Sequence, residues 1–316
     1  MPNDTSVVFL GTPLADDSTA LFTPLALKGN DILEGDAGND TLKGWAGQDD
    51  IKGELGSDKL YGGLDDDSLY GGRGYDTLYG GDGDDYIEGG AHKDRIFGGT
   101  GNDVIYGDNT PAYSGLLGPD GDDYIVAGGG NDTVYGEGGN DFINGNSGHD
   151  KLDGGDGNDT IFGGLGNDDI NGGAGDDKLV GQNGIDVIVA GSGDDTILGG
   201  QGSDTLTGGD GEDTFVFKPF TDLKLGWKDV ITDFDVDNDV IDLSAFNLNV
   251  DPNSEFDDFS NGMTQGLDSA FYQMGADVYI EAKPQLGYNL GSLGTDGAIV
   301  LENVNIDDLG AANFIF

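Results

Sequence analysis

The residues best suited to chemistry in this chain are aspartates that recur every nine positions. Between residues 26 and 216 the sequence divides into nonapeptides, nine copies over 26–106 and eleven over 118–216, and every copy has aspartate at its sixth position. Carboxylate and carbonyl oxygens are the ligands that Ca²⁺ prefers in proteins. We therefore predict that Ca²⁺ ions are bound by Asp31, Asp40, Asp49, Asp58, Asp67, Asp76, Asp85, Asp94, Asp103, Asp123, Asp132, Asp141, Asp150, Asp159, Asp168, Asp177, Asp186, Asp195, Asp204 and Asp213.

The other positions of the nonapeptide predict the backbone that carries these carboxylates. The first six follow the pattern Gly-Gly-x-Gly-x-Asp, as in 154–159, and the glycines allow a tight turn with positive φ. Position eight is apolar in every copy, from Leu33 to Phe215. Because neighbouring residues of a strand point to opposite faces, positions seven to nine predict a three-residue strand with position eight facing inward.

A nine-residue repeat of this composition predicts an all-β fold, a right-handed parallel β-roll, which is a β-solenoid with two nonapeptides in each turn. Each copy then lies over the one two copies later, so Asp31 is one layer from Asp49, and Asp40 is one layer from Asp58. A Ca²⁺ ion between stacked loops would take a carboxylate from each. An eleven-residue insert, 107–117, interrupts the stack, so seven intervals in the first block and nine in the second allow at most 16 ions.

Some loops depart from the glycine pattern. The eighth copy has His92 where glycine belongs and carries the positive charge of Lys93 beside it. The other departures are Ala26, Leu27, Trp45, Asp65 and Gln182. A side chain at a position that needs positive φ disfavours the loop, so we expect poor Ca²⁺ occupancy near Asp94 and toward the N-terminal end.

The charge of the chain restricts its partners and its folding. There are 61 acidic residues against 13 basic ones, which gives a net charge of −48. Such a charge repels itself and excludes nucleic acid and anionic membranes as partners, whereas it attracts divalent cations. Each repeat also buries only one apolar side chain in nine residues, and this burial is too small to offset the conformational entropy lost on ordering the chain. We therefore expect Ca²⁺ binding to drive the folding of the roll.

The segments outside the repeats have a different composition. Residues 217–316 contain fewer glycines and non-repeating aromatic residues, and the alternation at 277–281 and 298–302 is typical of strands, so we predict a β-rich C-terminal cap. Residues 1–25 are expected to cap the other end or to be partly disordered. The chain has no cysteine, no apolar run of the ~18 residues that a transmembrane segment requires, and no basic N-terminal region typical of a cleavable signal peptide.

The glycine–aspartate nonapeptides resemble those of the repeats-in-toxin (RTX) family, whose members have hemolysin-type calcium-binding repeats. The stretch 229–246 resembles the segment that follows the repeats in serralysin-type proteases, although Asp237 stands where that family usually has glycine. The residues Asn313-Phe-Ile-Phe316, preceded by Asp307 and Asp308, resemble the uncleaved type I secretion signal. The resemblance implies export by a type I ABC secretion machinery, and a protein that is secreted, extracellular or associated with the cell surface.

Enzymatic activity is not expected from this sequence. A zinc protease needs two histidines spaced four apart with a glutamate between them, whereas His92 and His149, the two histidines of the chain, are 57 residues apart. The segment 145–149 lacks the last glycine of the lipase pattern Gly-x-Ser-x-Gly.

The function that we expect is that of a secreted, non-enzymatic calcium-binding protein with a role at the cell surface, in a matrix or in adhesion. Its partner would be a surface polysaccharide or another component of the cell envelope. Two alternatives remain open, a Ca²⁺-dependent carbohydrate-binding module and a small pore-forming member of the RTX family.

Overall fold

The computed structural model describes residues 8–12, 29–108, 120–218, 227–246, 269–274, 277–282, 298–304, 308–309 and 311–315. Most of the predicted N-terminal segment and nine residues of the insert, 109–117, lie outside these ranges, as do Ala26, Leu27, Asp307 and Phe316. The chain divides into two compact units, an N-terminal unit of residues 1–165 and a C-terminal unit of residues 166–316. Among the described residues no helix is long and apolar enough to cross a membrane.

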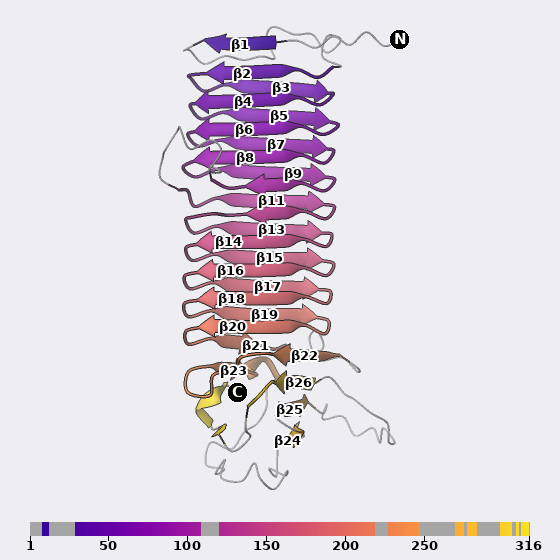
Figure 1. Cartoon of the computed structure of the whole chain (residues 1–316), viewed down its shortest axis with the longest axis vertical. Helices are drawn as coiled ribbons and strands as arrows, with labels where there is room; N and C mark the ends of the chain where they lie inside the picture. The colour runs from indigo at the N-terminus through magenta and orange to yellow at the C-terminus, as the bar shows by residue number, and fades with distance from the viewer. Residues whose placement is uncertain are drawn as a thin grey trace. The chain divides into compact units, whose positions relative to one another are not determined.

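The N-terminal unit contains two parallel sheets whose strands alternate along the chain (Figure 1). Sheet A contains, in spatial order, β1 (Val8–Thr12), β2 (Ile32–Asp36), β4 (Asp50–Leu55), β6 (Ser68–Arg73), β8 (Tyr86–Ala91), β10 (Val104–Tyr106), β12 (Thr133–Tyr135) and β14 (Lys151–Asp156). Sheet B contains β3 (Thr41–Ala46), β5 (Lys59–Leu64), β7 (Thr77–Asp82), β9 (Arg95–Thr100), β11 (Tyr124–Gly129), β13 (Phe142–Ser147) and β15 (Thr160–Leu165). This arrangement is the predicted β-solenoid, with one strand of each sheet in every turn.

The C-terminal unit begins with the same arrangement and ends in an antiparallel extension. One of its sheets contains, in spatial order, β16 (Asp169–Ala174), β18 (Val187–Ser192), β20 (Thr205–Asp210), β22 (Lys228–Ile231), β26 (Ala298–Leu301), β25 (Asp277–Ala282) and β24 (Ser269–Met274). The other contains β17 (Lys178–Asn183), β19 (Thr196–Gln201), β21 (Thr214–Val216), β23 (Val240–Asp242) and β27 (Phe314–Ile315). Short 3₁₀ turns occupy Ser244–Phe246 and Ala311–Asn313.

The strands that follow the repeats extend both sheets of the C-terminal unit before the chain direction changes. β22 pairs in parallel with β20, and β23 pairs in parallel with β21. β25 then pairs antiparallel with β26, and β24 antiparallel with β25. The C-terminal segment is therefore β-rich, as predicted, and its first strands continue the roll. The predicted domain boundary at residue 217 stays a prediction.

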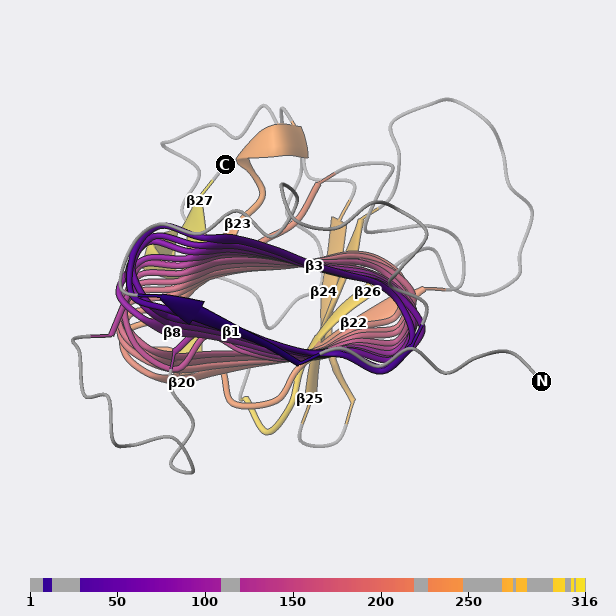
Figure 2. The ribbon, with the colours of Figure 1, turned by 90° about the horizontal axis from the view of Figure 1, so that it is seen from above.

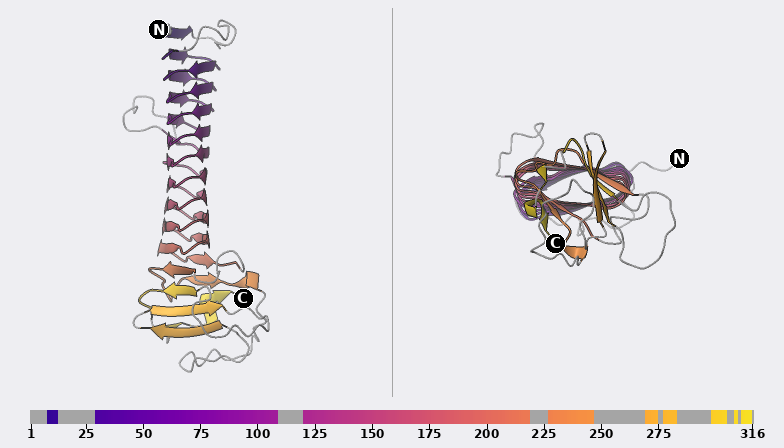
Figure 3. Two further views of the ribbon diagram at one scale, coloured as in Figure 1. Left: turned by 90° about the vertical axis from the view of Figure 1, so that its right-hand side faces the viewer. Right: turned by 90° about the horizontal axis from the view of Figure 1, so that it is seen from below.

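The core lies between the two sheets of each unit, as the views along and across the strands show (Figure 2, Figure 3). The apolar residue at position eight is at most 2% exposed in every repeat. Identical positions stack directly, so Leu42 pairs with Leu60 and Leu60 with Leu78. Because successive strands, nine residues apart in the sequence, alternate between the two sheets, each inward side chain contacts its neighbouring layers and the facing sheet.

Two expectations about the layers need correction. Most strands have six residues, and not three, because the first three positions of the following nonapeptide also pair. In β5, for example, Gly63 pairs with Gly81 of β7 and Leu64 with Asp82. A glycine-rich segment can join a parallel ladder because only its backbone groups form the hydrogen bonds.

The insert does not interrupt the stack. β9 pairs with β11 in register, Ile96 with Ile125, and β10 pairs with β12. The insert falls in the sequence between the end of β10 at Tyr106 and the start of β11 at Tyr124, and lengthening a connection costs little chain entropy. The prediction that the insert divides the roll into two stacks was therefore wrong, and the limit of 16 ions stays a prediction.

Candidate metal site

Within each unit the position-six aspartates form hydrogen-bonded ladders from layer to layer. In each step the backbone N–H of one aspartate donates to Oδ1 of the aspartate one layer later, as from Asp31 to Asp49 at 2.7 Å and from Asp40 to Asp58 at 2.8 Å. The same bond crosses the insert, from Asp94 to Asp123 at 2.6 Å. All 20 predicted aspartates take part, and each is at most 3% exposed. The predicted two-copy stacking of the aspartates is confirmed.

The second oxygen of these carboxylates is what fits a cation. Oδ2 is buried and accepts no hydrogen bond in Asp49, Asp58, Asp67, Asp76, Asp85, Asp94, Asp103, Asp123, Asp132, Asp141, Asp186, Asp195 and Asp213. A buried carboxylate oxygen without a partner is costly, and a bound cation removes that cost. The oxygen points toward the glycine at position one of its own repeat, where an added Cβ would lie 2.5 Å from Oδ2, as at Gly53 beside Asp58.

The same burial disturbs the acid–base equilibria of the ladders. Burial, followed by the charge of neighbouring aspartates, raises the pKa of Asp94 to about 10 from its ordinary value of 3.8. Burial likewise raises the pKa of Asp141 to about 9 and that of Asp67 to about 8, against the lowering effect of the backbone hydrogen bond. The ionised form of these carboxylates is therefore disfavoured unless a cation lies beside them.

The composition of the loops favours Ca²⁺ over softer metals. Among the described residues no three His, Cys, Asp or Glu side chains gather into a metal-binding group, so a bound ion must draw on backbone carbonyl oxygens in addition to one or two carboxylates. Ca²⁺ accepts six to eight such oxygens in irregular geometry, whereas Zn²⁺ requires nitrogen or sulfur ligands in a tetrahedron. The residues present fit Ca²⁺.

Glycine at position four allows the loops to stack closely. Gly56 has a φ of 149°, and an added Cβ would collide with the carbonyl oxygen of Gly38 in the layer before. The loop carbonyls of successive layers therefore come as near to each other as a glycine backbone permits.

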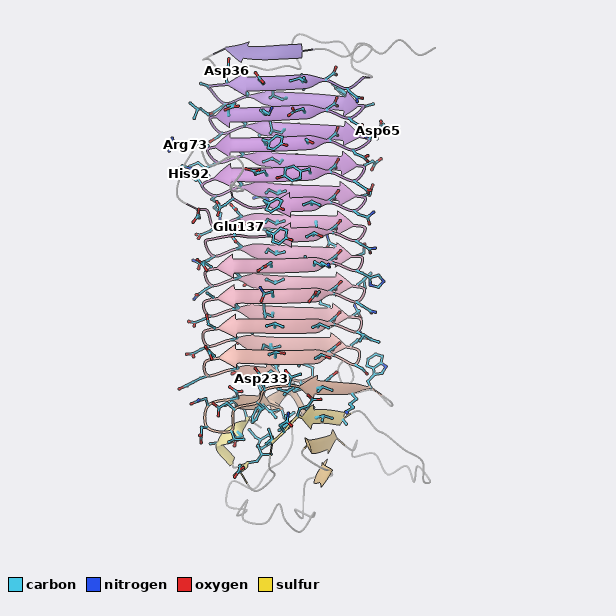
Figure 4. All side chains as sticks on the ribbon, in the orientation of Figure 1. Asp36, Asp65, Arg73, His92, Glu137 and Asp233 are labelled. Carbon is cyan, nitrogen blue, oxygen red and sulfur yellow. The ribbon has the colours of Figure 1, made fainter. Side chains whose placement is uncertain are left out.

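The predicted irregular loops adopt strained backbone conformations. Trp45, Asp65, His92 and Gln182 have φ between 76° and 81°, in the left-handed region that disfavours side chains. Four further residues that the sequence analysis did not single out, Asp36, Glu54, Glu137 and Asn146, have φ between 66° and 73° (several are labelled in Figure 4). The expected low occupancy of these loops stays a prediction.

Two aspartates beyond the repeats extend the ladders and were not predicted. Asp229 Oδ1 accepts the N–H of Asp204 at 2.9 Å, and Asp239 Oδ1 accepts the N–H of Asp213 at 3.1 Å. The sequence carries a signal for both, because Asp229-Val-Ile and Asp239-Val-Ile reproduce positions six to eight of the nonapeptide. Irregular spacing hides this signal from a search at a fixed period.

The ladder that ends at Asp239 ends in a side chain whose two oxygens are both used by protein groups. Asp239 Oδ2 accepts the N–H of Asp235 at 2.8 Å, so both of its oxygens are used. Asp233, labelled in Figure 4, accepts the N–H groups of Gly208 and Gly209 at 2.9 Å. These bonds satisfy the last loops without a cation.

Asp108, at the start of the insert, is a further buried carboxylate that the sequence analysis missed. Its side chain is 2% exposed, and it accepts the N–H of Gly121 at 3.0 Å and that of Gly138 at 3.4 Å. Burial and the nearby Asp123 raise the pKa of Asp108 to about 8. Asp108 thus connects the chain before the insert to Gly121 after it and to Gly138 of the next layer.

Comparisons with known proteins agree with this geometry. The model of the family RTX calcium-binding nonapeptide repeat (4 copies) matches residues 26–60, 61–91, 89–109, 118–152, 144–179 and 180–215. The AlgE6R2 subunit of the Azotobacter vinelandii mannuronan C5-epimerase is similar in structure, with 25% identity over 48% of this chain and 88% of the subunit, and a TM-score of 0.35.

The extracellular lipase LipA from Serratia marcescens is 16% identical over 73% of this chain and 40% of the lipase, with a TM-score of 0.32. Both TM-scores are below 0.5, so neither likeness describes the whole chain. No curated protein matches the sequence.

Proposed function

Because the chain belongs to the family of RTX calcium-binding nonapeptide repeat proteins, we propose that it is a secreted, non-enzymatic protein that folds on binding Ca²⁺ outside the cell. The protein would leave the cell through a type I ABC secretion machinery and serve at the cell surface, in a matrix or in adhesion. Its partner would be a surface polysaccharide or another component of the cell envelope.

The observation that carries the proposal is the row of buried carboxylate oxygens without a hydrogen bond, in the 13 repeat aspartates named above. Bringing ionised carboxylates together one layer apart without a counter-charge opposes folding. Any ion that binds the folded loops and not the unfolded chain stabilises the fold by mass action. Binding free energy then becomes folding free energy.

The two oxygens of each carboxylate have different roles in such a loop. Oδ1 of each aspartate orders the backbone of the preceding layer, and Oδ2 is left to hold the ion, as in Asp49 and Asp67. Bound Ca²⁺ supplies the positive charge that lets carboxylates of adjacent layers stay ionised. The glycines keep the loop carbonyls close enough to complete the oxygen shell.

An extracellular role is supported by the concentration of Ca²⁺ that such a fold needs. Modules of extracellular proteins bind Ca²⁺ with Kd values of about 10⁻⁴–10⁻³ M. A chain with a net charge of −48 and this affinity would stay unfolded where Ca²⁺ is scarce and fold where it is abundant. Such a chain would pass a secretion channel unfolded.

Far-UV circular dichroism of the full chain during a CaCl₂ titration tests the proposal. We expect little β signal in excess chelator and a cooperative gain of β signal near millimolar Ca²⁺. MgCl₂ at the same concentration is the control, and it should fail because Mg²⁺ requires near-octahedral geometry and retains its waters. An unchanged β spectrum in chelator would contradict the proposal.

A further inference from the structure

The two outer faces of the N-terminal unit differ in charge. The side chains at positions two, seven and nine of each nonapeptide point outward, because positions one and eight are buried. We call the outward positions of β3, β5, β7, β9, β11, β13 and β15 face B, and those of β2, β4, β6, β8, β10, β12 and β14 face A. The two faces lie on opposite sides of the flattened roll (Figure 2).

Face B has no acidic side chain at these positions, all of which the structure describes, and the one acid elsewhere on its strands is the exposed Asp82 at position three of β7. It carries the cations Lys43, Lys59 and Arg95 in a chain whose net charge is −48. The repeat pattern does not require this, since positions seven and nine hold acidic residues on face A. Face B is therefore a positively charged surface on a strongly negative protein.

Aromatic rings form a ladder on face B, and a second ladder of Tyr70, Tyr86, Tyr106 and Tyr135 lies on face A. The ring centroids of Tyr61 and Tyr79, and those of Tyr79 and Phe97, lie 4.9 Å apart with planes within 7° of parallel. Tyr124 and Phe142 stack in the same way. Stacked rings cover one another's faces and expose their edges, which carry positive partial charge.

The cations of face B are held against these rings. Lys43 Nζ lies 4.8 Å from the centroid of Tyr61, and Arg95 Cζ lies 5.1 Å from that of Tyr124. Held side chains lose less conformational entropy when a partner docks. Because the ring faces are covered, a sugar ring could not stack on them, and the partner must be recognised by its charge.

Face A presents the opposite charge at the same layer spacing. Its exposed and half-buried acids are Glu34, Asp36, Asp50, Glu54, Glu137 and Asp153, against the two bases Lys52 and Lys151, a balance of −4. Both faces belong to one solenoid with strands ~4.8 Å apart. The rows of charged residues on face A therefore have the same spacing as those on face B, so the two faces can meet row against row.

We infer that face B of one Ca²⁺-loaded molecule docks on face A of a second copy of this chain. The contact joins two different surfaces that lie on opposite sides of the roll, so it does not close into a dimer and each added molecule offers a new face. The product is an open stack. This inference rests on the proposed function, because the carboxylates of metal-free molecules would repel each other.

The size of face B predicts weak contacts. Seven strands ~4.8 Å apart and ~20 Å long give a surface of about 600 Å² on each partner. This is at the low end for a specific interface. Exposed charges are screened beyond ~10 Å at 0.1 M salt. Association should therefore be visible at micromolar concentrations and low salt, and should decrease as salt rises.

Sedimentation velocity of the full chain in Ca²⁺ tests the inference. We expect the mass to rise with concentration past twice the monomer mass of 32.7 kDa, and to fall on raising NaCl from about 50 to 500 mM. The triple variant K43E/K59E/R95E should associate at least tenfold more weakly. The control variant K151E makes the same type of charge change on face A and should not weaken association.

A mixing experiment separates complementarity from general charge effects. The variant E34K/E54K/D153K reverses face A and should also lose self-association. Equal amounts of the two triple variants should associate with each other, since a reversed face B and a reversed face A are again complementary. Circular dichroism in Ca²⁺ confirms that each variant is folded, and the single variant K59E replaces the triple one if it is not.

Three results would overturn the inference. A wild type that is folded in Ca²⁺ but monomeric at all concentrations excludes the contact and leaves the proposed function intact. Binding of a soluble polyuronate to face B of a monomeric wild type would show that the face serves an anionic polymer instead. A wild type that does not fold in Ca²⁺ would remove the proposed function and this inference together.

Discussion

Replacing Asp186 by asparagine should have opposite effects on the metal-free and the Ca²⁺-loaded protein. Asp186 is fully buried, and its Oδ1 accepts the N–H of Asp168 at 2.9 Å while its Oδ2 has no hydrogen bond. The amide oxygen of asparagine can keep the first bond, whereas the substitution removes the negative charge that an ion would bind. The variant therefore separates the two roles of the carboxylate.

The magnitude follows from the acid–base shift at this position. Burial raises the pKa of Asp186 from 3.8 to about 7, and about three units correspond to ~4 kcal/mol of cost for the ionised form above pH 7. Water that reaches the loop screens part of this cost, so we expect the Asp186→Asn substitution to stabilise the metal-free fold by ~2 kcal/mol. Loss of one carboxylate ligand should raise the Ca²⁺ midpoint about tenfold, or ~1.4 kcal/mol.

Two titrations followed by circular dichroism measure these effects. In chelator, a stabilising osmolyte such as trimethylamine N-oxide induces the metal-free fold, and its midpoint should be lower for Asp186→Asn than for the wild type. In buffer, the CaCl₂ midpoint should be higher for the variant. Asp210→Asn, at an exposed residue of the same unit, is the control for the loss of one charge.

One pattern of results would refute the reasoning. If Asp186→Asn destabilised the protein equally in chelator and in Ca²⁺, the carboxylate would be important for packing alone. If the variant folded at lower Ca²⁺ than the wild type, the buried oxygen would not be a ligand.

Three further predictions concern pH, loop strain and the end of the ladders. In metal-free protein the ladder carboxylates have pKa values above the ordinary 3.8, most of them at about 6 to 8. The stability that they contribute is therefore complete below about pH 4 and is lost as pH rises through the raised pKa values. Circular dichroism in chelator should show more β structure at pH 5 than at pH 8. Gly56→Ala should lower the free energy of unfolding of the Ca²⁺-loaded protein, measured by urea denaturation, by ~2 kcal/mol or more, because its Cβ meets the Gly38 carbonyl. His92→Gly should raise that free energy by ~1 kcal/mol by relieving a φ of 81°. Asp239→Ala should lower stability by ~2 kcal/mol in thermal melts with Ca²⁺, since it leaves the N–H groups of Asp213 and Asp235 without an acceptor, and an unchanged melting temperature would contradict this role.

The nine-residue period predicted the parts of the structure that depend on local spacing. It placed Leu42 and Leu60 in the core and Asp40 over Asp58, because identical residues at a fixed period must stack in a solenoid. It could not predict that glycines such as Gly63 belong to strands, since their pairing depends on backbone groups of the next layer and not on side-chain type.

Features that depend on distant segments were the ones that sequence reasoning missed. The insert looks like an interruption in the sequence, but Ile96 of β9 still pairs with Ile125 of β11. Asp229 and Asp239 take their places in the ladders after loops of irregular length, so no fixed period reaches them. The difference in charge between the two outer faces depends on which repeats belong to which sheet.

The aspartate ladder has a direction, and this gives the two ends of the repeat array different roles. Every loop N–H in the ladder of the C-terminal unit is received by a carboxylate that comes later in the chain, and the last ones are received by Asp229 and Asp239. The N–H groups at position six therefore find their acceptors in the layer that follows, whereas N–H groups at position five, such as those of Asp194 and Glu212, find theirs in the layer before. The last two repeats thus depend on the segment after them, since a chain that ended before Asp229 would lack the acceptors of the Asp204 and Asp213 N–H groups.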